Sequence, residues 1–157
     1  HSFLLDIFIE LKANTEAVLV LIGDGELKSQ VEQKIDECGL KKDVILLGAR
    51  DDAVDIMASV FDVIAFPSLY EGLPLTVVEA QAVGVPILVA ENITREAEFD
   101  SGLVSYLSLQ ASAELWSNKL LEMSSARQKE ADLAHFYKTD FYFPNHIIKL
   151  KRLYSGE

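Results

Sequence analysis

The stretch FPSLYEGLPLTVVEAQAVGVPILV at residues 66–89 decides the expected fold, because strand, loop, helix and strand signals follow one another along it. The apolar run 63–66 that leads into it is too short for a core helix and predicts a strand buried on both faces. Pro74 favours the first turn of a helix, because the backbone amide that proline lacks has no partner there. Gly84 ends this helix, since a residue without Cβ turns easily into the left-handed conformation. The apolar run 87–89 predicts the next buried strand.

The same alternation of strand and helix signals runs through the rest of the chain. In chain order, the patterns predict a helix at 2–13, a buried strand at 17–22, a helix at 25–38, a strand at 44–47, a short helix at 51–58, a helical turn within 93–99, an edge strand at 104–107, helices at 111–123 and up to about 137, and a last short helix around 147–154. This alternation predicts an α/β fold with a Rossmann-like, doubly wound parallel sheet.

Ligands of such a sheet bind beyond the carboxyl ends of its strands. The loops at these ends are residues 23–25, 48–52, 67–74 and 90–94. We expect these four loops to line one crevice.

Length and composition are those of one globular domain. The chain has 157 residues, of which 50% are hydrophobic and 25% are charged, so a single domain can bury a sizeable core. No apolar run approaches the roughly 20 residues that span a bilayer, and no export signal opens the sequence. Cys38 is the single cysteine, which excludes an internal disulfide and fits the reducing cytoplasm. The sequence begins at His1, directly in an apolar helical pattern, so we expect an upstream part to be missing.

The net charge of −11 argues against a nucleic-acid partner, because binding to a phosphate backbone needs clustered lysine and arginine. The C-terminal segment 138–157 is the exception, with four basic residues against two acidic ones and an aromatic run at 141–143. We expect a basic, aromatic helical tail. It could pack back across a domain interface or touch anionic lipid at the inner face of the membrane.

Several common sites are excluded by their spacing. Gly23 and the glycine two residues later follow a strand, but Lys28 stands where a dinucleotide fingerprint needs its third glycine. No Walker A motif occurs, and the histidines and the cysteine do not cluster at metal-ligand spacings. Ser68 lacks the flanking glycines of a hydrolase nucleophile. Asn92 opens a glycosylation triplet, which we interpret as chance because no export signal is present.

The junction at residues 71–79 has the features of an anion site. Gly72 allows a ligand to approach the backbone, and the amides near Leu73 and Leu75 lie at the positive end of a helix, where phosphate binds well. Glu79 lies on a largely apolar helix and needs hydrogen-bond donors, which sugar hydroxyls supply. The alternative is that Glu71 only complements the helix dipole and that Glu79 faces water.

Four motifs carry a family resemblance. They are the Glu-x7-Glu region at 66–90, the segment HSFLL at 1–5, GDGEL at 23–27 and the V-x-x-L-G-x-R turn at 44–50, and the likeness extends to Trp116. The chain resembles the C-terminal, nucleotide-sugar-binding domain of retaining glycosyltransferases of family four, which have the GT-B fold and serve capsule and exopolysaccharide synthesis.

The resemblance implies a role for each matching residue. Glu71 would contact the donor sugar as the catalytic carboxylate, and Glu79 would hold the ribose hydroxyls. Arg50 would lie near the base, in the turn after its strand. The loop that holds the diphosphate and sugar would consist of Gly72, Leu73, Pro74 as a spacer, and Leu75, with Gly23 as a further substrate-binding residue. The family needs no metal, and we expect no cofactor.

The chain departs from the family at three places. The first strand of the domain, and an Arg-x4-Lys pair that grips the diphosphate, would lie before His1. The usual Gly-Gly after the strand at 87–89 is replaced by ENITRE at 91–96. We expect the family's N-terminal acceptor domain to be missing from these residues as well. Because the missing strand would be central, the strands at 17–22 and 63–66 would lose their shared neighbour. The gap would be closed by rearrangement, be filled by a partner chain, or leave the domain marginally stable.

The function expected from the resemblance is donor binding within a longer enzyme. Residues 1–157 would form one donor-binding domain of a cytoplasmic glycosyltransferase that moves a sugar from a nucleotide-diphosphate sugar, with UDP as the expected nucleotide, to a polysaccharide or lipid-linked acceptor. We expect these residues alone to bind donor weakly and to transfer nothing. The alternative is a non-catalytic α/β interaction or regulatory module in which Glu71 and Glu79 are structural.

Overall fold

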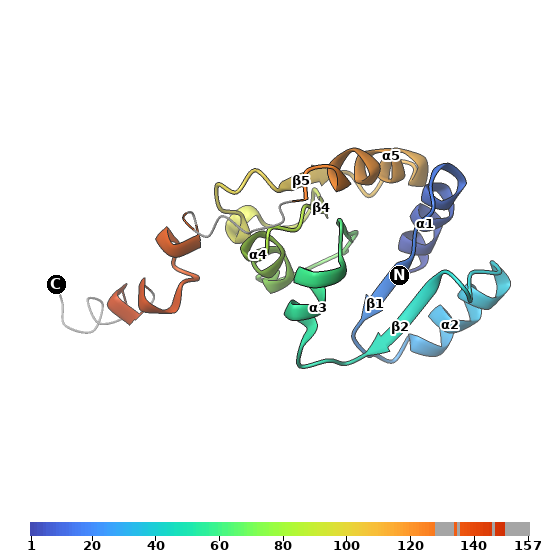
Figure 1. Cartoon of the computed structure of the whole chain (residues 1–157), viewed down its shortest axis with the longest axis horizontal. Coiled ribbons are helices and arrows are strands. Elements are labelled where there is room, and N and C mark those ends of the chain that lie inside the picture. Colours follow the sequence, from blue (N-terminus) through green and yellow to red (C-terminus); the bar gives the residue numbers. More distant parts are fainter. Residues whose placement is uncertain (128–133, 135, 146, 150–157) are drawn as a thin grey trace.

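The computed structural model describes all residues except 128–133, 135, 146 and 150–157, and it shows an α/β fold (Figure 1). Its elements are α1 (Ser2–Asn14), β1 (Leu19–Ile22), α2 (Lys28–Glu37), β2 (Val44–Gly48), α3 (Ala53–Val60), β3 (Ile64–Phe66), α4 (Leu75–Ala82), β4 (Ile87–Ala90), the 3-10 turn η1 (Arg95–Ala97), β5 (Val104–Leu107), α5 (Ala113–Ser124) and the 3-10 turn η2 (Phe136–Lys138). All five expected strands are present, and the predicted α/β class is confirmed.

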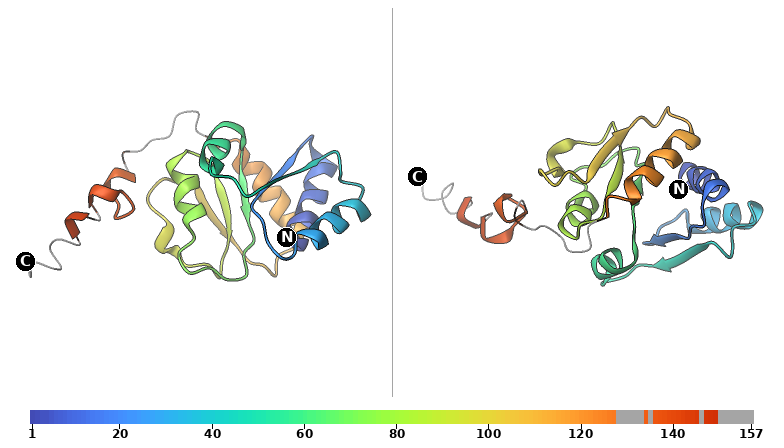
Figure 2. Two further views of the ribbon diagram at one scale, coloured as in Figure 1. Left: turned by 90° about the horizontal axis from the view of Figure 1, so that it is seen from below. Right: turned by 45° about the horizontal axis from the view of Figure 1, so that its top comes forward.

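The strands form two separate parallel sheets. One sheet pairs β1 with β2, and the other has the order β3-β4-β5. Figure 2 shows the two sheets apart, and a cavity of about 1160 Å³ lies between them, lined by residues of β1, β3, α1 and α5. The gap expected between β1 and β3 is therefore not closed by rearrangement.

Burial along β1 and β3 differs from the prediction. All four residues of β1 are only half-buried, whereas the sequence predicted a buried strand. In β3, Ile64 is buried but Ala65 and Phe66 are half-buried. Both strands line the cavity. Both strands are partly exposed because each has an edge that faces the cavity and is unpaired within the described residues.

The helix of the opening stretch ends as its sequence predicts. Gly84 takes a φ of +72°, which favours glycine. The amide of Val85 then donates to the carbonyl of Ala80 at 2.9 Å, and the amide of Gly84 donates to Gln81 at 3.2 Å. This is a Schellman motif, which satisfies carbonyls at the end of α4. The chain turns directly into β4, all of whose residues are buried.

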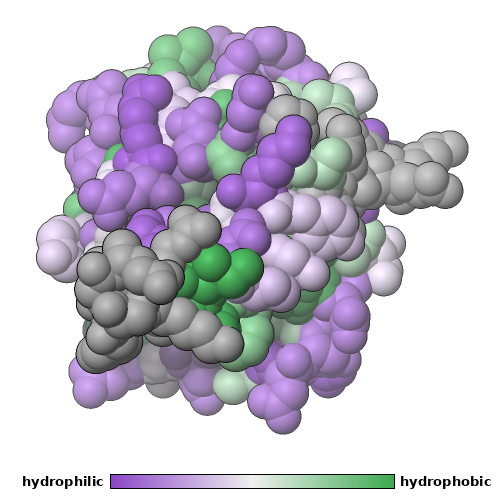
Figure 3. All heavy atoms as spheres, turned by 90° about the vertical axis from the view of Figure 1, so that its left-hand side faces the viewer, coloured by the Kyte–Doolittle hydropathy of each residue, from purple (hydrophilic) through white to green (hydrophobic). Residues whose placement is uncertain are grey.

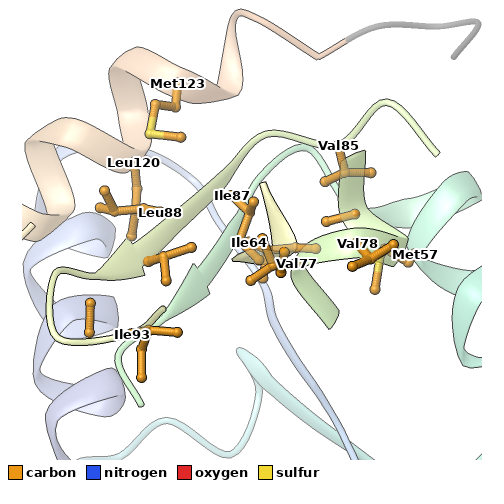
Figure 4. Close-up of a cluster of buried hydrophobic side chains, with 14 of the residues drawn as sticks. Met57, Ile64, Val77, Val78, Val85, Ile87, Leu88, Ile93, Leu120 and Met123 are labelled. Atoms are coloured by element: carbon orange, nitrogen blue, oxygen red, sulfur yellow. The ribbon is translucent and has the colours of Figure 1, made fainter. Parts of the chain in front are cut away.

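Two hydrophobic cores stabilise the fold, and α1 contributes to both. The larger core lies around β3, β4, α4 and α5 (Figure 4), and Ile7 of α1 belongs to it. Leu5 and Phe8 of α1 belong to the smaller core beside β1 and α2. Phe3 also packs edge-on against the fully buried Trp116 of α5, with 5.9 Å between ring centroids. Helix α1 is thus the main link between the two sheets.

Arg127 forms hydrogen bonds with the carboxyl ends of two helices. Arg127, just after α5, donates to the carbonyls of Ala58 and Phe61 at the end of α3 at 2.5 and 3.0 Å. It also donates to Val83 and Gly84 at the end of α4, at 3.1 and 2.8 Å. A cation is favourable there because helix carbonyls carry partial negative charge.

The C-terminal segment is helical at residues 143–145 and 147–149. The helix predicted around 147–154 therefore stays a prediction beyond residue 149, where the described part of the chain ends. Its Lys149 forms an ion pair with Asp140. Most described residues are hydrophilic on the face that Figure 3 shows. The helix expected up to about residue 137 and the end of the tail fall largely outside the described residues, and contact with lipid stays a prediction.

Candidate functional site

The loop between β3 and α4 presents the first carboxylate of the Glu-x7-Glu stretch. Leu69 and Tyr70 at its tip are 83% and 84% exposed. Glu71 is half-buried, and Ser68 donates from Oγ to its Oε1 at 2.7 Å. The same hydroxyl lies 3.2 Å from the carbonyl oxygen of Tyr70. A short hydrogen bond to a carboxylate restrains its direction, so Glu71 is held although the loop tip is exposed.

The amino end of α4 is open to an anion. Within the described chain no side chain caps this helix end, and Pro74 occupies the N-cap position. Amides in the first turn of a helix lack partners within it and favour negative charge. Gly72 and Leu73 are exposed, and a Cβ added to Gly72 would meet nothing within 4 Å. Pro74 itself is buried and anchors the turn. A phosphate group therefore has space to reach these amides.

Glu79 lies on the second turn of α4. Its side chain is half-buried between the buried residues Val78 and Ala80. Among the described residues, the Glu79 carboxylate has no hydrogen-bond or ion-pair partner. A half-buried carboxylate gains from hydrogen-bond donors, so hydroxyl groups of a ligand would suit this position.

Gln81, which the sequence analysis did not single out, fastens α4 to the chain after β4. Its Nε2 donates to the carbonyls of Val77 and Ala97 at 2.9 and 2.8 Å. Its Oε1 accepts from the amide of Phe99 at 3.0 Å and from the hydroxyl of Ser101 at 2.9 Å. Gln81 is only 2% exposed. A glutamine on an otherwise apolar helix face was a signal of this anchoring role.

Asn92 joins the loops after β3 and β4. Its Nδ2 donates to the carbonyl of Leu69 at 2.7 Å and lies 3.4 Å from the carbonyl of Ser68. From the sequence, Asn92 was interpreted only as part of a chance glycosylation match. Its place in the loop 90–94, at the carboxyl end of a strand, was the signal that could have found it.

Gly23 and Arg50 lie in the two loops of the other sheet. The amide of Gly23 donates to the carbonyl of Gly48 at 2.8 Å, which joins the loop after β1 to the last residue of β2. Arg50 donates from Nε and Nη2 to the two carboxylate oxygens of Asp52 at 2.7 and 2.6 Å. This hydrogen-bonded pair lowers the pKa of Asp52 and raises the pKa of Arg50. The side chain of Arg50 is thus held by Asp52, two residues further along the same loop.

The structure brings the predicted residues together in two groups. Glu71, Glu79 and the loop 72–75 lie with the β3-β4-β5 sheet, while Gly23 and Arg50 lie with the β1-β2 sheet. Within the described residues, no hydrogen bond or ion pair joins the two groups. The cavity between the sheets is lined by none of them.

The described residues contain no group of three or more histidine, cysteine, aspartate or glutamate side chains that could hold a metal ion. None of their helices has the length and apolar character needed to cross a bilayer.

Curated relatives are glycosyltransferases. The putative glycosyltransferase EpsF of Bacillus subtilis is 38% identical over 127 residues, which cover 80% of this chain and 33% of that protein. An Escherichia coli enzyme, UDP-Gal:alpha-D-GlcNAc-diphosphoundecaprenol alpha-1,3-galactosyltransferase, is 38% identical over 101 residues, which cover 61% of this chain and 26% of that protein. The chain spans about a third or less of the length of these two relatives.

Solved structures share the fold. WaaG, involved in lipopolysaccharide biosynthesis, matches with a TM-score of 0.70 at 21% identity, over 98% of this chain and 44% of that one. Anabaena Alr3699/HepE in complex with UDP-glucose matches with a TM-score of 0.70 at 22% identity, over 92% and 43%. The family model described as glycosyl transferases group 1 matches residues 1–138. The chain therefore belongs to the group 1 glycosyl transferases, which confirms the resemblance drawn from its Glu-x7-Glu stretch.

Proposed function

We propose that this chain is the donor-binding domain of a retaining glycosyltransferase that takes its sugar from a nucleotide-diphosphate sugar. The observation that carries the proposal is the open amino end of α4. It is uncapped in the described chain, its Gly72 faces free space, and half-buried carboxylates precede and follow it in the sequence at Glu71 and Glu79. Few ligands other than a phosphorylated sugar or nucleoside would use both the amides and the carboxylates.

The proposed ligand has one group for each part of the site. Its diphosphate would accept hydrogen bonds from the amides at residues 72–75, where the helix dipole favours negative charge. The ribose hydroxyls would donate to Glu79, and the sugar would contact Glu71. The base would lie toward Arg50. Stabilising the departing diphosphate with these amides is electrostatic catalysis, since the charge grows as the glycosidic bond breaks.

The acceptor and the biological product follow from relatives only as proposals. The Escherichia coli relative is named as acting on a diphosphoundecaprenol-linked sugar, and an Erwinia amylovora relative is named for amylovoran biosynthesis. We propose a role in polysaccharide synthesis with a UDP-sugar donor, because Anabaena Alr3699/HepE is described with UDP and UDP-glucose. The acceptor would bind to a part of the full-length protein outside these 157 residues.

We expect the 157 residues alone to bind donor weakly, because the two groups of site residues lie on sheets that are not paired with each other. The net charge of −11 also opposes a diphosphate. Calorimetry with UDP-glucose should give a Kd weaker than about 1 mM for these residues and a clearly tighter one for the full-length protein. Equally tight binding by both would contradict the weak-binding expectation while supporting the donor site itself.

The function is tested by Glu79→Gln in the full-length protein. This change keeps the shape of the side chain but weakens its capacity to accept from two hydroxyl groups. We expect donor turnover to fall at least about tenfold, as for the loss of a hydrogen bond to a charged group. Glu32→Gln, on the exposed face of α2, is the matched control and should leave turnover unchanged. Unchanged turnover in Glu79→Gln would favour the structural interpretation of the carboxylates.

A further inference from the structure

Asn92 follows the buried strand β4, and its side chain contacts the exposed loop after β3. On its own side, Ala90 is fully buried and Ile93 is 3% exposed. The amide of Ile93 donates to the carbonyl of Ala90 at 3.0 Å, and the amide of Glu91 donates to Leu107 of β5 at 3.0 Å. The backbone on both sides of Asn92 is therefore fixed to the buried sheet.

The loop on the other side has little packing of its own. Leu69 and Tyr70 are more than four-fifths exposed, so few apolar contacts hold this segment in place. The side chain of Asn92 donates to the carbonyl of Leu69 at 2.7 Å and contacts that of Ser68 at 3.4 Å. These contacts tie the exposed loop to the rigid end of β4.

A further hydrogen bond connects these contacts to Glu71, the first carboxylate of the site. Ser68, whose carbonyl Asn92 contacts, donates from Oγ to Oε1 of Glu71 at 2.7 Å. Displacing the backbone at 68–69 would move the Ser68 hydroxyl and with it the Glu71 carboxylate. A continuous set of contacts thus runs from the end of β4 to Glu71.

We propose that Asn92 is a positioning residue for the sugar half of the donor, acting on Glu71 through the backbone of residues 68–69 and the Ser68 hydroxyl. This inference rests on the donor site proposed above. It adds that the segment ENITRE, where the family's usual Gly-Gly would lie, supplies a side chain that orients the neighbouring loop. A carboxylate must be held closely to its productive position to act on a sugar, and such support comes from residues around it.

The test separates the sugar from the nucleotide. Asn92→Asp keeps the size of the side chain but replaces the amide donor with an acceptor, which the two carbonyls repel. In the full-length protein, we expect the Kd of UDP-glucose to rise about tenfold, as for the loss of one hydrogen bond to the loop. The Kd of UDP should change less than about twofold, because UDP lacks the glucosyl group that Glu71 would contact. Calorimetry measures both constants.

Two control comparisons keep the result specific. Asn14 also donates from its amide to a carbonyl, that of Glu10 at 3.0 Å, but within α1, so Asn14→Asp should change neither Kd. Ser68→Ala should act in the same direction as Asn92→Asp, and Ser68→Thr, which keeps a hydroxyl, should restore UDP-glucose binding. The Ser68 variants also decide the question if Asn92→Asp fails to fold.

A double substitution tests the route of the effect. If Asn92 acts through Glu71, adding Asn92→Asp to Glu71→Gln should raise the Kd of UDP-glucose by less than about twofold further. An equal loss of UDP and UDP-glucose binding in Asn92→Asp, or no loss of either, would overturn the positioning role. If the unmodified protein binds neither UDP nor any of UDP-glucose, UDP-galactose and UDP-N-acetylglucosamine, the donor site itself is wrong and the positioning role falls with it.

Discussion

Strands β4 and β1 have similar sequences but different surroundings. β4 reads ILVA and all four residues are fully buried, whereas β1 reads LVLI and all four are only half-buried. β4 pairs with a strand on each side, and β1 pairs with β2 alone. An apolar run therefore predicts a strand, but its neighbours in the sheet decide how deeply it is buried.

The same contrast divides the proposed site. The loop proposed to bind the sugar and the diphosphate belongs to the well-packed sheet, and the turn with Arg50 belongs to the sheet with the smaller core. Helix α1 connects the two cores, since no strand pairing does. Donor binding across both groups would then depend on how firmly the two sheets are held relative to each other. Substitutions in each sheet should reveal how much the stability of the two sheets differs.

Matched leucine substitutions in the two strands should differ most. Leu88 of β4 is fully buried in the larger core (Figure 4), and Leu88→Ala should cost about 3–4 kcal/mol of the free energy of unfolding. Leu21 of β1 is half-buried beside the cavity, so Leu21→Ala should cost only about 1 kcal/mol. Urea unfolding of both variants measures the two losses. Equal losses would show that the open edge of β1 is covered in solution.

Arg127 should be the next most sensitive position. Arg127→Ala leaves carbonyls at the ends of α3 and α4 without their shared donor. We expect a loss of about 2–3 kcal/mol, as for hydrogen bonds to a charged group. The control is Lys119→Ala, which removes an exposed ion pair with Glu122 at 2.8 Å and should cost less than about 1 kcal/mol. Similar losses for both would mean that Arg127 adds little to the larger sheet.

How far the sequence could predict this structure depends on the range of each contact. Pro74 and Gly84 act on their own turns, so the helix between them was correctly predicted. The four carbonyls bound by Arg127 lie 43 to 69 residues away from it, and no local pattern marks them. The contact of Asn92 with Leu69 spans 23 residues, so the sequence indicated the loop but not its partner. Strand β1 is half-buried because no strand of the described chain pairs with one of its edges. The apolar pattern of a strand does not indicate how many strands pair with it.

Substitution of Tyr106, in the edge strand β5, should have the smallest effect on stability. Strand β5 is an edge of the larger sheet. Its hydroxyl is buried without a hydrogen-bond partner among the described residues, and its ring lies 4.2 Å from the Arg95 guanidinium carbon. Burial raises the pKa of Tyr106 to about 12, and the negative charge of Glu98 contributes a smaller increase.

The raised pKa fixes the direction of a pH effect. The unfolded chain loses the tyrosine proton near pH 10, whereas the folded chain keeps it until about pH 12. The contribution of Tyr106 to stability is thus fully present below pH 10 and falls as the pH rises toward 12. Tyr106→Phe should flatten the decline of stability between these pH values, and at pH 7 it should change stability by less than about 1 kcal/mol, since the lost hydroxyl has no partner. Tyr70→Phe, at a site that is 84% exposed, should leave the decline unchanged. Urea unfolding at pH 9, 10 and 11 distinguishes the two variants, and parallel curves for Tyr106→Phe and the unmodified chain would mean that the β5 edge is as open to water as β1.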